Sequence, residues 1–526
     1  MMLFSKRTIS ILLVIMMLFT ILLSGCSSNT SGEAEVVEPQ ILYLASYTAP
    51  IIDWDPSICF SVGNGVLCNV YDTLLKYEPD DNSFTPVLAT DYSKSEDGLT
   101  WTFHIREGVK FHDGTDVNAE AVKYSIDRSK NMKKGASFIW APLNEVKVVD
   151  DYTVEFILDY PAALDLIVAC GYSAFIMSPT AAEQGTEWFG EGNECGSGPY
   201  MLQSQVQGDE VVLTQFEDYW GGWEGEHFDK IIMKNISENA SRRQMIENGD
   251  ADIVTSLMVE DLLALEDNPN VVVNVSTSYA NTIGFFNTQV EPFDNKLVRQ
   301  ALCYAFPYDD IIDYVSQGFS SKATGPVPQG IWGALEEPTY TYDLDKAREL
   351  LAEAGYPDGG FDMEITYISG VEDRKKTAEL YKAELAKIGV NAEIKGMPWD
   401  SMWELAKSPN PEDRQDWLSI AWWPDVISPA SWFWSLYHSE ESPFFNLGYY
   451  NNPELDAIIE EADTLSGTDR AAAEELYKKA GQIVVDDAVS LYVGDGKSIY
   501  VINKELKNFE ANPAYPYVLF FYDMYK

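Results

Sequence analysis

The chain has 526 residues, of which 46% are hydrophobic, and this length exceeds what one hydrophobic core usually serves, so we expect two or three domains. Its 83 acidic residues outnumber the 36 basic ones and give a formal net charge of -47. Because nucleic-acid binding relies on Lys and Arg side chains that neutralise phosphates, we expect no nucleic-acid partner. The acidity alone does not separate a salty habitat from a simple need for solubility.

The chain begins with the features of a lipoprotein export signal. Basic residues precede an apolar run at 9–23, and small residues then lead to Cys26. An anchor helix with an incidental cysteine needs about 20 apolar residues, and this run is shorter. We therefore predict a signal peptide at 1–25, a flexible tether at 26–39, and a lipid on Cys26 that holds the protein at the membrane. The protein would then work outside the cytoplasmic membrane, at the cell surface or in a periplasm.

The first half of the chain predicts alternating strands and helices. An apolar segment from Ile41 predicts a first strand, and a helix is expected around 65–75. Side chains alternate between apolar and polar at 99–106 and again at 154–158, as half-buried strands require. Asn118 is a suitable N-cap for a helix that follows. A mixed α/β layer is implied.

The second half carries clearer helix patterns. Asp343 is a suitable N-cap for a helix at 344–354, whose apolar residues share one face. A second helix is expected to open at Asn452 and to close at Gly467. We expect both apolar stripes to face the core. No internal repeat is found, which argues against a solenoid.

Cysteine and histidine usage bounds the chemistry. After Cys26, an odd number of cysteines remains, so at least one thiol is unpaired within the chain: Cys59, Cys68, Cys170, Cys195 and Cys303. We expect Cys303, on an apolar helix, to be the free one, and pairing among the other four stays open. The 4 histidines lack the close spacing of a metal-ligand pair, so we expect no metal and no cofactor.

Several sequence blocks agree in order and spacing with one protein family. The blocks are Ser95–Gly114, Gly196–Tyr200, Tyr219–Trp220, Phe286–Asp294, Val298–Leu302, Ala347–Gly355 and Gly448–Ala462. Over about residues 40–510, the chain resembles the family 5 extracellular solute-binding proteins of peptide and nickel importers. The resemblance implies an α/β fold of two lobes around a cleft, like periplasmic binding proteins of class II, with an extra α/β domain inserted in the first lobe. The implied boundaries are 40–80, 195–290 and 500–526 for lobe I, 81–194 for the inserted domain, and 291–499 for lobe II.

The resemblance also points to ligand-binding residues. In peptide-binding members, a similar Asp-x-x-x-Pro stretch supplies the carboxylate that receives the ligand's amino terminus, with a tryptophan three residues earlier; these positions here are Asp425 and Trp422. The alternative is an aspartate that caps a helix or turn beside Pro424. Arg374 lies where some dipeptide-binding relatives place a carboxylate-binding arginine, and the alternative there is a solvated side chain at a helix start.

Aromatic residues supply further candidates for the cleft. Trp423, Trp432 and Trp434 are expected either to form walls that hold side chains or sugar rings, or to belong to the core. Tyr47 follows the first predicted strand, and Tyr279 precedes a later one, so both are candidates for the cleft edge.

The sequence therefore predicts a membrane-tethered receptor that captures a di- or oligopeptide between two lobes and delivers it to the permease of an ABC importer. The same fold with an oligosaccharide as cargo is the alternative, and nickel chelates are a lesser one. A secreted hydrolase is a further hypothesis, but the chain has no Gly-x-Ser-x-Gly elbow, no His-Glu-x-x-His helix and no phosphate loop. We expect a monomer that is not an enzyme.

Overall fold

The structure is a computed structural model that describes residues 39–47, 53–59, 63–440 and 444–526. The expected signal peptide, the lipid site at Cys26 and the tether up to residue 38 lie outside the described residues. Gln40–Lys526 forms one unit, and the following description concerns this unit alone. None of its described helices is long and apolar enough to cross a membrane.

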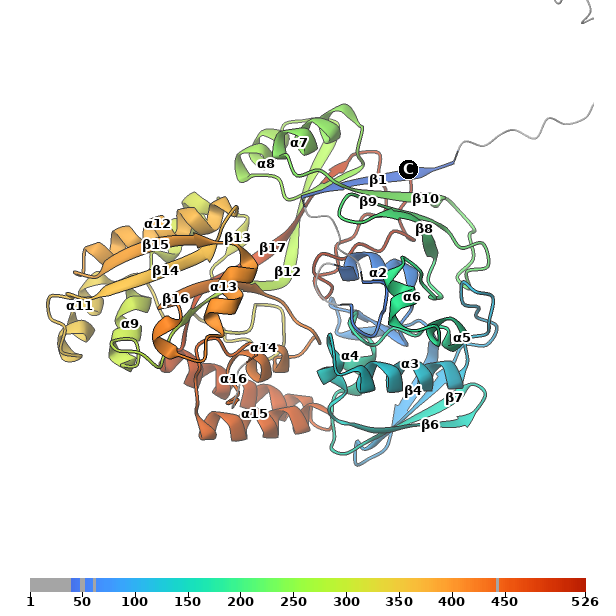
Figure 1. Ribbon diagram of the computed structural model, residues 1–526, viewed down its shortest axis with the longest axis horizontal. Helices are drawn as coiled ribbons and strands as arrows, with labels where there is room; N and C mark the ends of the chain where they lie inside the picture. Colours follow the sequence, from blue (N-terminus) through green and yellow to red (C-terminus); the bar gives the residue numbers. More distant parts are fainter. Residues whose placement is uncertain (1–38, 48–52, 60–62, 441–443) are drawn as a thin grey trace, which may run out of the picture. The chain divides into compact units, whose positions relative to one another are not determined.

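Two long strands lie in the middle of the largest sheet. β12 (Val271–Phe286) and β17 (Ser490–Asn503) pair antiparallel over most of their length. Beyond β17 lie, in order, β11 (Ile253–Thr255), β1 (Ile41–Ser46), β10 (Lys230–Asn235), β9 (Glu210–Gln215) and β8 (Tyr200–Val206). Beyond β12 lie β16 (Trp417–Trp422), β14 (Asp362–Ile368) and β15 (Asn391–Met397), while the short β13 (Ser320–Ser321) pairs with β17. Figure 1 shows these two groups of strands at opposite ends of the long pair.

The long pair is irregular at its middle. Its register shifts between Thr277 and Asn281 and again between Thr282 and Ile283. Such bulges leave residues outside the ladder and bend the strand. Because the bend falls between the two groups of strands, the residues that it frees from pairing lie where the two halves of the unit meet.

A separate four-stranded sheet lies in the first half of the chain. Its order is β4 (Ala89–Lys94), β5 (Thr100–Ile105), β7 (Thr153–Leu158) and β6 (Leu143–Asp150). The two alternating strands predicted here are confirmed, because β5 and β7 each bury one face. The predicted helix is α3 (Ala119–Met132), and the Asn118 side chain accepts a hydrogen bond from the backbone N–H of Ala121. The helix expected at 65–75 is shorter: α2 ends at Val70, and residue 75 already begins β2.

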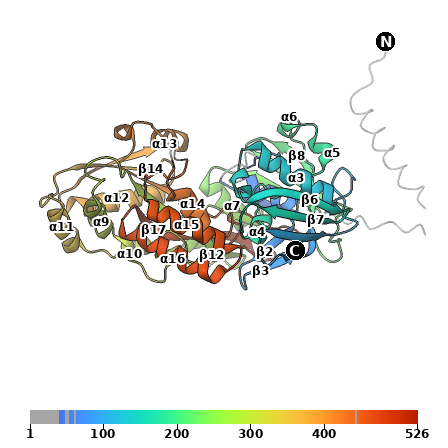
Figure 2. The same cartoon turned by 90° about the horizontal axis from the view of Figure 1, so that it is seen from below.

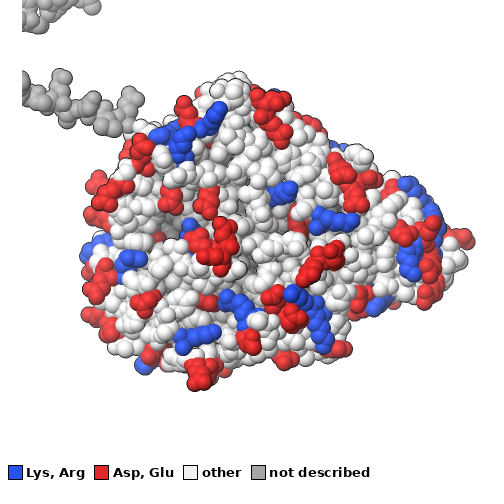
Figure 3. All heavy atoms as spheres, turned by 180° about the vertical axis from the view of Figure 1, so that it is seen from behind, with Lys and Arg blue, Asp and Glu red and all other residues white. Residues whose placement is uncertain are grey.

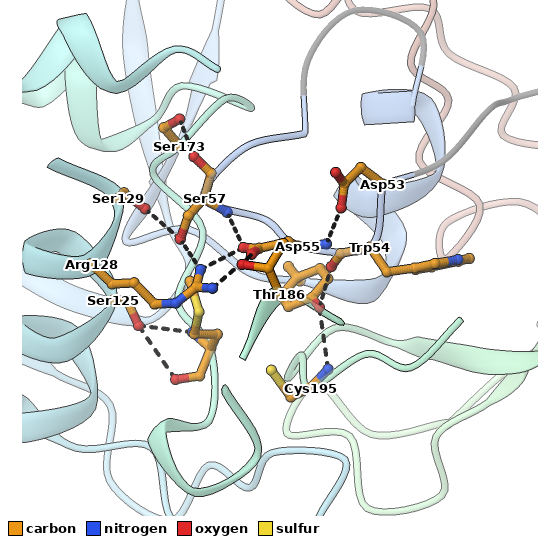
Figure 4. Close-up of polar contacts among 12 residues, drawn as sticks. Asp53, Trp54, Asp55, Ser57, Ser125, Arg128, Ser129, Ser173, Thr186 and Cys195 are labelled. Atoms are coloured by element: carbon orange, nitrogen blue, oxygen red, sulfur yellow. Dashed lines mark hydrogen bonds and ion pairs between the residues drawn. The ribbon is translucent and has the colours of Figure 1, made fainter. Parts of the chain in front are cut away.

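An ion pair joins α3 to the segment 53–59 (Figure 4). The Arg128 Nη2 atom donates to Asp55 Oδ2 at 2.6 Å, while its Nη1 contacts Asp55 Oδ1 and donates to Ser57 Oγ at 2.6 Å. The Asp55 side chain is fully buried. Removing one member of a buried, hydrogen-bonded ion pair leaves the other charge unpaired at a cost of about 3 to 5 kcal/mol. The pair therefore links α3, which packs on the four-stranded sheet, to the segment 53–59, which follows β1 in the chain.

The helices predicted in the second half are confirmed. Asp343 accepts a hydrogen bond from the backbone N–H of Lys346 at the start of α11 (Leu344–Glu353). Asn452 caps α15 (Pro453–Ser466), which packs side by side with α16 (Arg470–Asp486) in Figure 2. Gly467 follows the last residue of α15, as expected.

The remaining described elements are shorter. The hairpin strands are β2 (Leu75–Glu78) and β3 (Ser83–Pro86), and 3-10 or π turns occur at Ser137–Trp140, Ile311–Val315 and Pro411–Asp413. The other helices are α2 (Asn64–Val70), α4 (Leu164–Val168), α5 (Pro179–Ala182), α6 (Thr186–Gly190), α7 (Asn239–Asn248), α8 (Val259–Leu265), α9 (Lys296–Tyr304), α10 (Tyr308–Asp310), α12 (Glu372–Ala386), α13 (Trp399–Ala406) and α14 (Ala430–Leu436).

Thiols and surface charge complete the description. Cys303 is buried and free, and Cys68, Cys170 and Cys195 are free thiols too. Figure 3 shows acidic side chains spread over one face of the molecule, with Lys and Arg scattered among them. The net charge of -47 is therefore not gathered in one patch of that face.

Candidate ligand-binding site

A cavity lies at the bend of the long strand pair. It has a volume of about 530 Å³, within the range of small-molecule sites. Residues of β1 and β11 line one side, and Ser278 and Asn281 line its floor at the bulge of β12. Arg374 and Trp423 line the side that belongs to the second group of strands, and Tyr517 lines it from the C-terminal loop. We call this space the central cavity.

Asp425 follows β16 in the segment that leads to α14. Its side chain is only 6% exposed, and its Oδ2 atom is buried without a hydrogen-bond partner. Burial raises the pKa of the Asp425 carboxyl to about 7. Among the described residues, no Lys or Arg forms an ion pair with this carboxylate. Burial of a charge without a partner is costly. A ligand that donates a hydrogen bond to this carboxylate would therefore remove that cost.

The geometry gives no support to the helix-cap alternative for Asp425. The N-cap residue of α14 is Pro429, and within the described chain no backbone N–H donates to the Asp425 carboxylate. The group that is engaged is the Asp425 backbone carbonyl, which lies 2.5 Å from the Cys170 thiol. Tyr172 and Tyr515 also border the small space beside this carboxylate, whose volume is about 10 Å³. Residues of the first half of the chain and of the C-terminal loop therefore border the acid.

Arg374 lies in the first turn of α12. Its side chain is half-buried, and desolvation lowers the pKa of its guanidinium. Neither an ion pair nor a side-chain hydrogen bond is described for it, although Asp373 and Tyr517 are near enough to affect its pKa. An arginine that lines a cavity and has unused donors is suited to a carboxylate.

The four tryptophans occupy different environments. Trp423 lines the central cavity, donates its indole N–H to Tyr172 Oη at 3.1 Å, and meets the Tyr517 ring edge-on. Trp434 lines a different, apolar cavity of about 460 Å³, which Asp425 also borders. We call this second space the side cavity.

The other two tryptophans are buried behind these walls. Trp422 donates to the Ser431 carbonyl and packs against Phe445, and it borders none of the described cavities. Trp432 is fully buried and donates to Asn281 Oδ1 at 3.2 Å. Because Asn281 lines the central cavity, Trp432 acts behind the wall by orienting that side chain.

The two predicted tyrosines do not line the central cavity. Tyr47 is exposed, with the Arg242 guanidinium 5.5 Å from its ring centroid, and its hydroxyl lies 4.0 Å from the place of a Cβ on Gly370. It therefore lies near the loop that leads to α12. Tyr279 is buried, and its ring closely approaches Gly330. The geometry favours a packing role for Tyr279.

Some cavity residues escaped the sequence reasoning. Asn281 is a buried polar residue in β12, but this strand also carries other polar residues, so the sequence held no signal that singled Asn281 out. Tyr517 lies in a C-terminal loop with a left-handed backbone, where no periodicity reveals which way a side chain points. Among the described residues, no group of three His, Cys, Asp or Glu side chains is suited to hold a metal ion.

The comparison with known families decides the classification. Residues 83–444 match the family described as bacterial extracellular solute-binding proteins, family 5 Middle. The chain belongs to this family. The resemblance drawn from the sequence blocks is thereby confirmed, and with it the mixed α/β, two-lobed class of fold.

Relatives and solved structures agree with the family 5 assignment. The glutathione-binding protein GsiB of Pectobacterium atrosepticum is 30% identical over 458 residues, which are 86% of this chain and 88% of the relative. The periplasmic binding protein DppA of Helicobacter pylori, solved with the peptide STSA, is similar with a TM-score of 0.79 and 26% identity, covering 92% of this chain and 98% of that one.

A dipeptide-binding protein from Pseudoalteromonas, solved with Met-Leu, has a TM-score of 0.79 and 24% identity, covering 93% and 100% of the two chains, and shows the shared fold. These relatives are solute-binding proteins. The boundaries predicted for the lobes and the inserted domain stay predictions, and so do the individual ligand contacts.

Proposed function

We propose that this family 5 protein is the substrate-binding lipoprotein of an ABC importer and that it captures a di- or oligopeptide. The observation that carries the proposal is Asp425: a buried carboxylate whose Oδ2 atom has no partner, beside a cavity. An ammonium that enters this site loses its water, and a fixed carboxylate replaces that hydration with a charge-assisted hydrogen bond. The ligand's amino terminus is the group that meets this requirement.

Arg374 is assigned the opposite end of a short ligand. It lines the central cavity with donors that no described residue uses, so it is suited to bind the terminal carboxylate of a peptide. Trp423 and Tyr517 line the central cavity together with Arg374 and offer apolar contact to side chains and to the peptide backbone. Trp432 holds Asn281 in place from behind.

Capture and delivery follow from the two-sided site. A ligand that touches residues of both halves of the unit stabilises the closed state, and the free energy available for closure is its difference in affinity between the closed and open states. The closed form is then recognised by the permease subunits of the importer. A lipid on Cys26 and the tether at 26–39 keep the receptor on the extracytoplasmic face of the membrane, near that permease.

The test compares peptides that differ only at their amino terminus. Calorimetric titration of a dipeptide and a tetrapeptide, each free or N-acetylated, should show that acetylation abolishes binding. Asp425→Asn should weaken binding of the free peptides by about 3 to 5 kcal/mol, which is about two to three and a half decades in Kd. Equal affinity for free and acetylated peptides would refute the assigned role of Asp425. Glutathione belongs in the panel, because a 30% identical relative is named for binding it.

The oligosaccharide alternative makes the opposite prediction. A neutral sugar gives Asp425 no charge to pair with, so the affinity of the protein for an oligosaccharide should be insensitive to Asp425→Asn.

Incubation of candidate peptides and glycans with pure protein tests the hydrolase hypothesis, since product formation would favour an enzyme and saturable binding without products favours the receptor. Mass determination of the lipidated N-terminus tests the assignment of Cys26.

A further inference from the structure

The side cavity is apolar and lies next to Asp425. Its walls come from the turn after α3 and the region of α4 on one side, and from α14 and α15 on the other. Three large apolar side chains that line it are well exposed, namely Phe138 at 47%, Trp434 at 36% and Phe444 at 53%. Exposed apolar side chains gathered around one hollow are typical of a binding surface.

The charged residues of this cavity are all acidic. Asp425, Glu440 and Asp463 line it, and its described lining includes no Lys or Arg. Burial raises the pKa of the Asp463 carboxyl to about 6 although a hydrogen bond with the Trp434 side chain lowers it, and no described Lys or Arg forms an ion pair with this carboxyl. Glu440 is exposed and accepts a hydrogen bond from the backbone N–H of Phe444. The buried Oδ2 atom of Asp425, which has no partner, is an independent sign that a donor is missing here.

The position of Asp425 decides which part of a peptide enters the side cavity. In an amino acid, the ammonium and the side chain share one Cα, so a ligand whose ammonium binds Asp425 must place its first side chain in a space that Asp425 borders. Two such spaces are described. The smaller has about 10 Å³, room for no more than a water molecule, whereas the side cavity has about 460 Å³. The first side chain therefore enters the side cavity.

We propose that the side cavity selects peptides whose first residue carries a long basic side chain, Lys or Arg. The aliphatic stem contacts the rings of Phe138 and Trp434, and the terminal cation binds the Asp463 carboxylate. A long cationic side chain combines an apolar stem with a charged end, which is the combination that this lining accommodates. This inference rests on the proposed contact between Asp425 and the ligand's amino terminus.

The test uses two peptides of nearly equal shape. Lys-Leu and norleucine-Leu differ by the terminal ammonium of the first side chain, and each is titrated calorimetrically as the dipeptide and as a tetrapeptide extended with alanine. In the wild-type protein, the lysine peptide should have a Kd lower by about tenfold or more, since a charge-assisted hydrogen bond distinguishes the two. Asp463→Asn should remove this ratio. Glu461→Gln, which neutralises an exposed acid on the same helix, should retain it.

The outcomes separate this inference from the proposed function. If both peptides bind equally and both require a free amino terminus, the preference for a basic side chain is wrong and the peptide-binding function stands. If N-acetylated peptides bind as well as free ones, the role of Asp425 fails and the inference fails with it. If Asp463→Asn folds, as judged by its circular dichroism, and keeps the ratio, the assignment of the cation to Asp463 is overturned.

Discussion

Replacing Asp425 by asparagine should change how the stability of the unliganded protein depends on pH. The carboxyl has an ordinary pKa of 3.8 and a pKa of about 7 in the folded protein. Between these values the unfolded chain has released the proton while the folded protein keeps it, so the unfolded state binds fewer protons and stability falls as pH rises. Above about pH 7 both states are ionised, and the full penalty is present.

The size of the effect follows from the shift. About three pKa units at 1.36 kcal/mol each give about 4 kcal/mol over the whole titration, of which about 3 kcal/mol falls between pH 5 and pH 8. Asp425→Asn has no proton to lose, so its free energy of unfolding relative to wild type should rise by about 3 kcal/mol from pH 5 to pH 8. Contributions that do not depend on this proton, such as the unpaired amide, cancel in the comparison.

The assay is urea denaturation followed by tryptophan fluorescence at pH 5 and pH 8, without ligand. Glu461→Gln is the matched control, because it also removes one negative charge but from an exposed side chain, and it should follow the wild-type profile. Parallel pH profiles for wild type and Asp425→Asn would refute the reasoning. Such a result would mean that the carboxyl is hydrated or paired in solution, and the argument for an ammonium at this position would lose its physical basis.

Three further predictions concern charge at the site and in the fold. For an empty receptor that stays closed, affinity for a peptide with a free amino terminus should fall by about tenfold per pH unit below about pH 7, because only ionised Asp425 pairs with the ammonium. Titrations at pH 5.5 and 6.5 check this, and a flat profile would contradict it and indicate a hydrated carboxyl in an open cleft. Amidating a peptide's carboxyl terminus should weaken binding about tenfold or more in wild type and leave the Kd unchanged in Arg374→Met, whereas equal losses in both proteins would exclude Arg374 as the partner. Arg128→Ala should lower the free energy of unfolding by about 3 to 5 kcal/mol, because it leaves the buried Asp55 carboxylate unpaired. Urea denaturation measures this loss, and a loss within about 0.5 kcal/mol would show that the ion pair is solvated.

Local signals in the sequence predicted local structure well. Asp343 and Asn452 were recognisable as helix caps, because each stands directly before an amphipathic run and its side-chain oxygen can accept a hydrogen bond from a backbone N–H of the first turn. The end of α2 was missed, because the segment between α2 and β2 has no Gly or Pro to mark a helix end, and periodicity does not separate a buried helix from a buried strand over so few residues.

The site was predictable only in part. Asp425 and Arg374 came from a motif shared with a family, and both line cavities in the structure. Trp422 came from the same motif as Asp425, and Tyr279 came from its position before a predicted strand. Both pack away from the cavities, because adjacent residues in an extended segment point to opposite sides and the sequence does not say which side is the cleft. Tyr517 belongs to a C-terminal loop that reaches the cavity through long-range packing.

The cost of burying Asp425 links the site to the motion of the lobes. Cys170, Tyr172 and Tyr515, from the first half and the C-terminal loop, border the space beside the acid, so we expect opening of the cleft to return it to water. In the closed form at pH above about 7, the unpaired charge then opposes closure by up to about 4 kcal/mol, which corresponds to about a thousandfold shift toward the open state. A ligand ammonium removes this penalty as it binds. Under the proposed function, the carboxylate that binds the ligand would therefore also weaken the closed state of the empty receptor, because a ligand shifts a conformational equilibrium only by its difference in affinity for the two states.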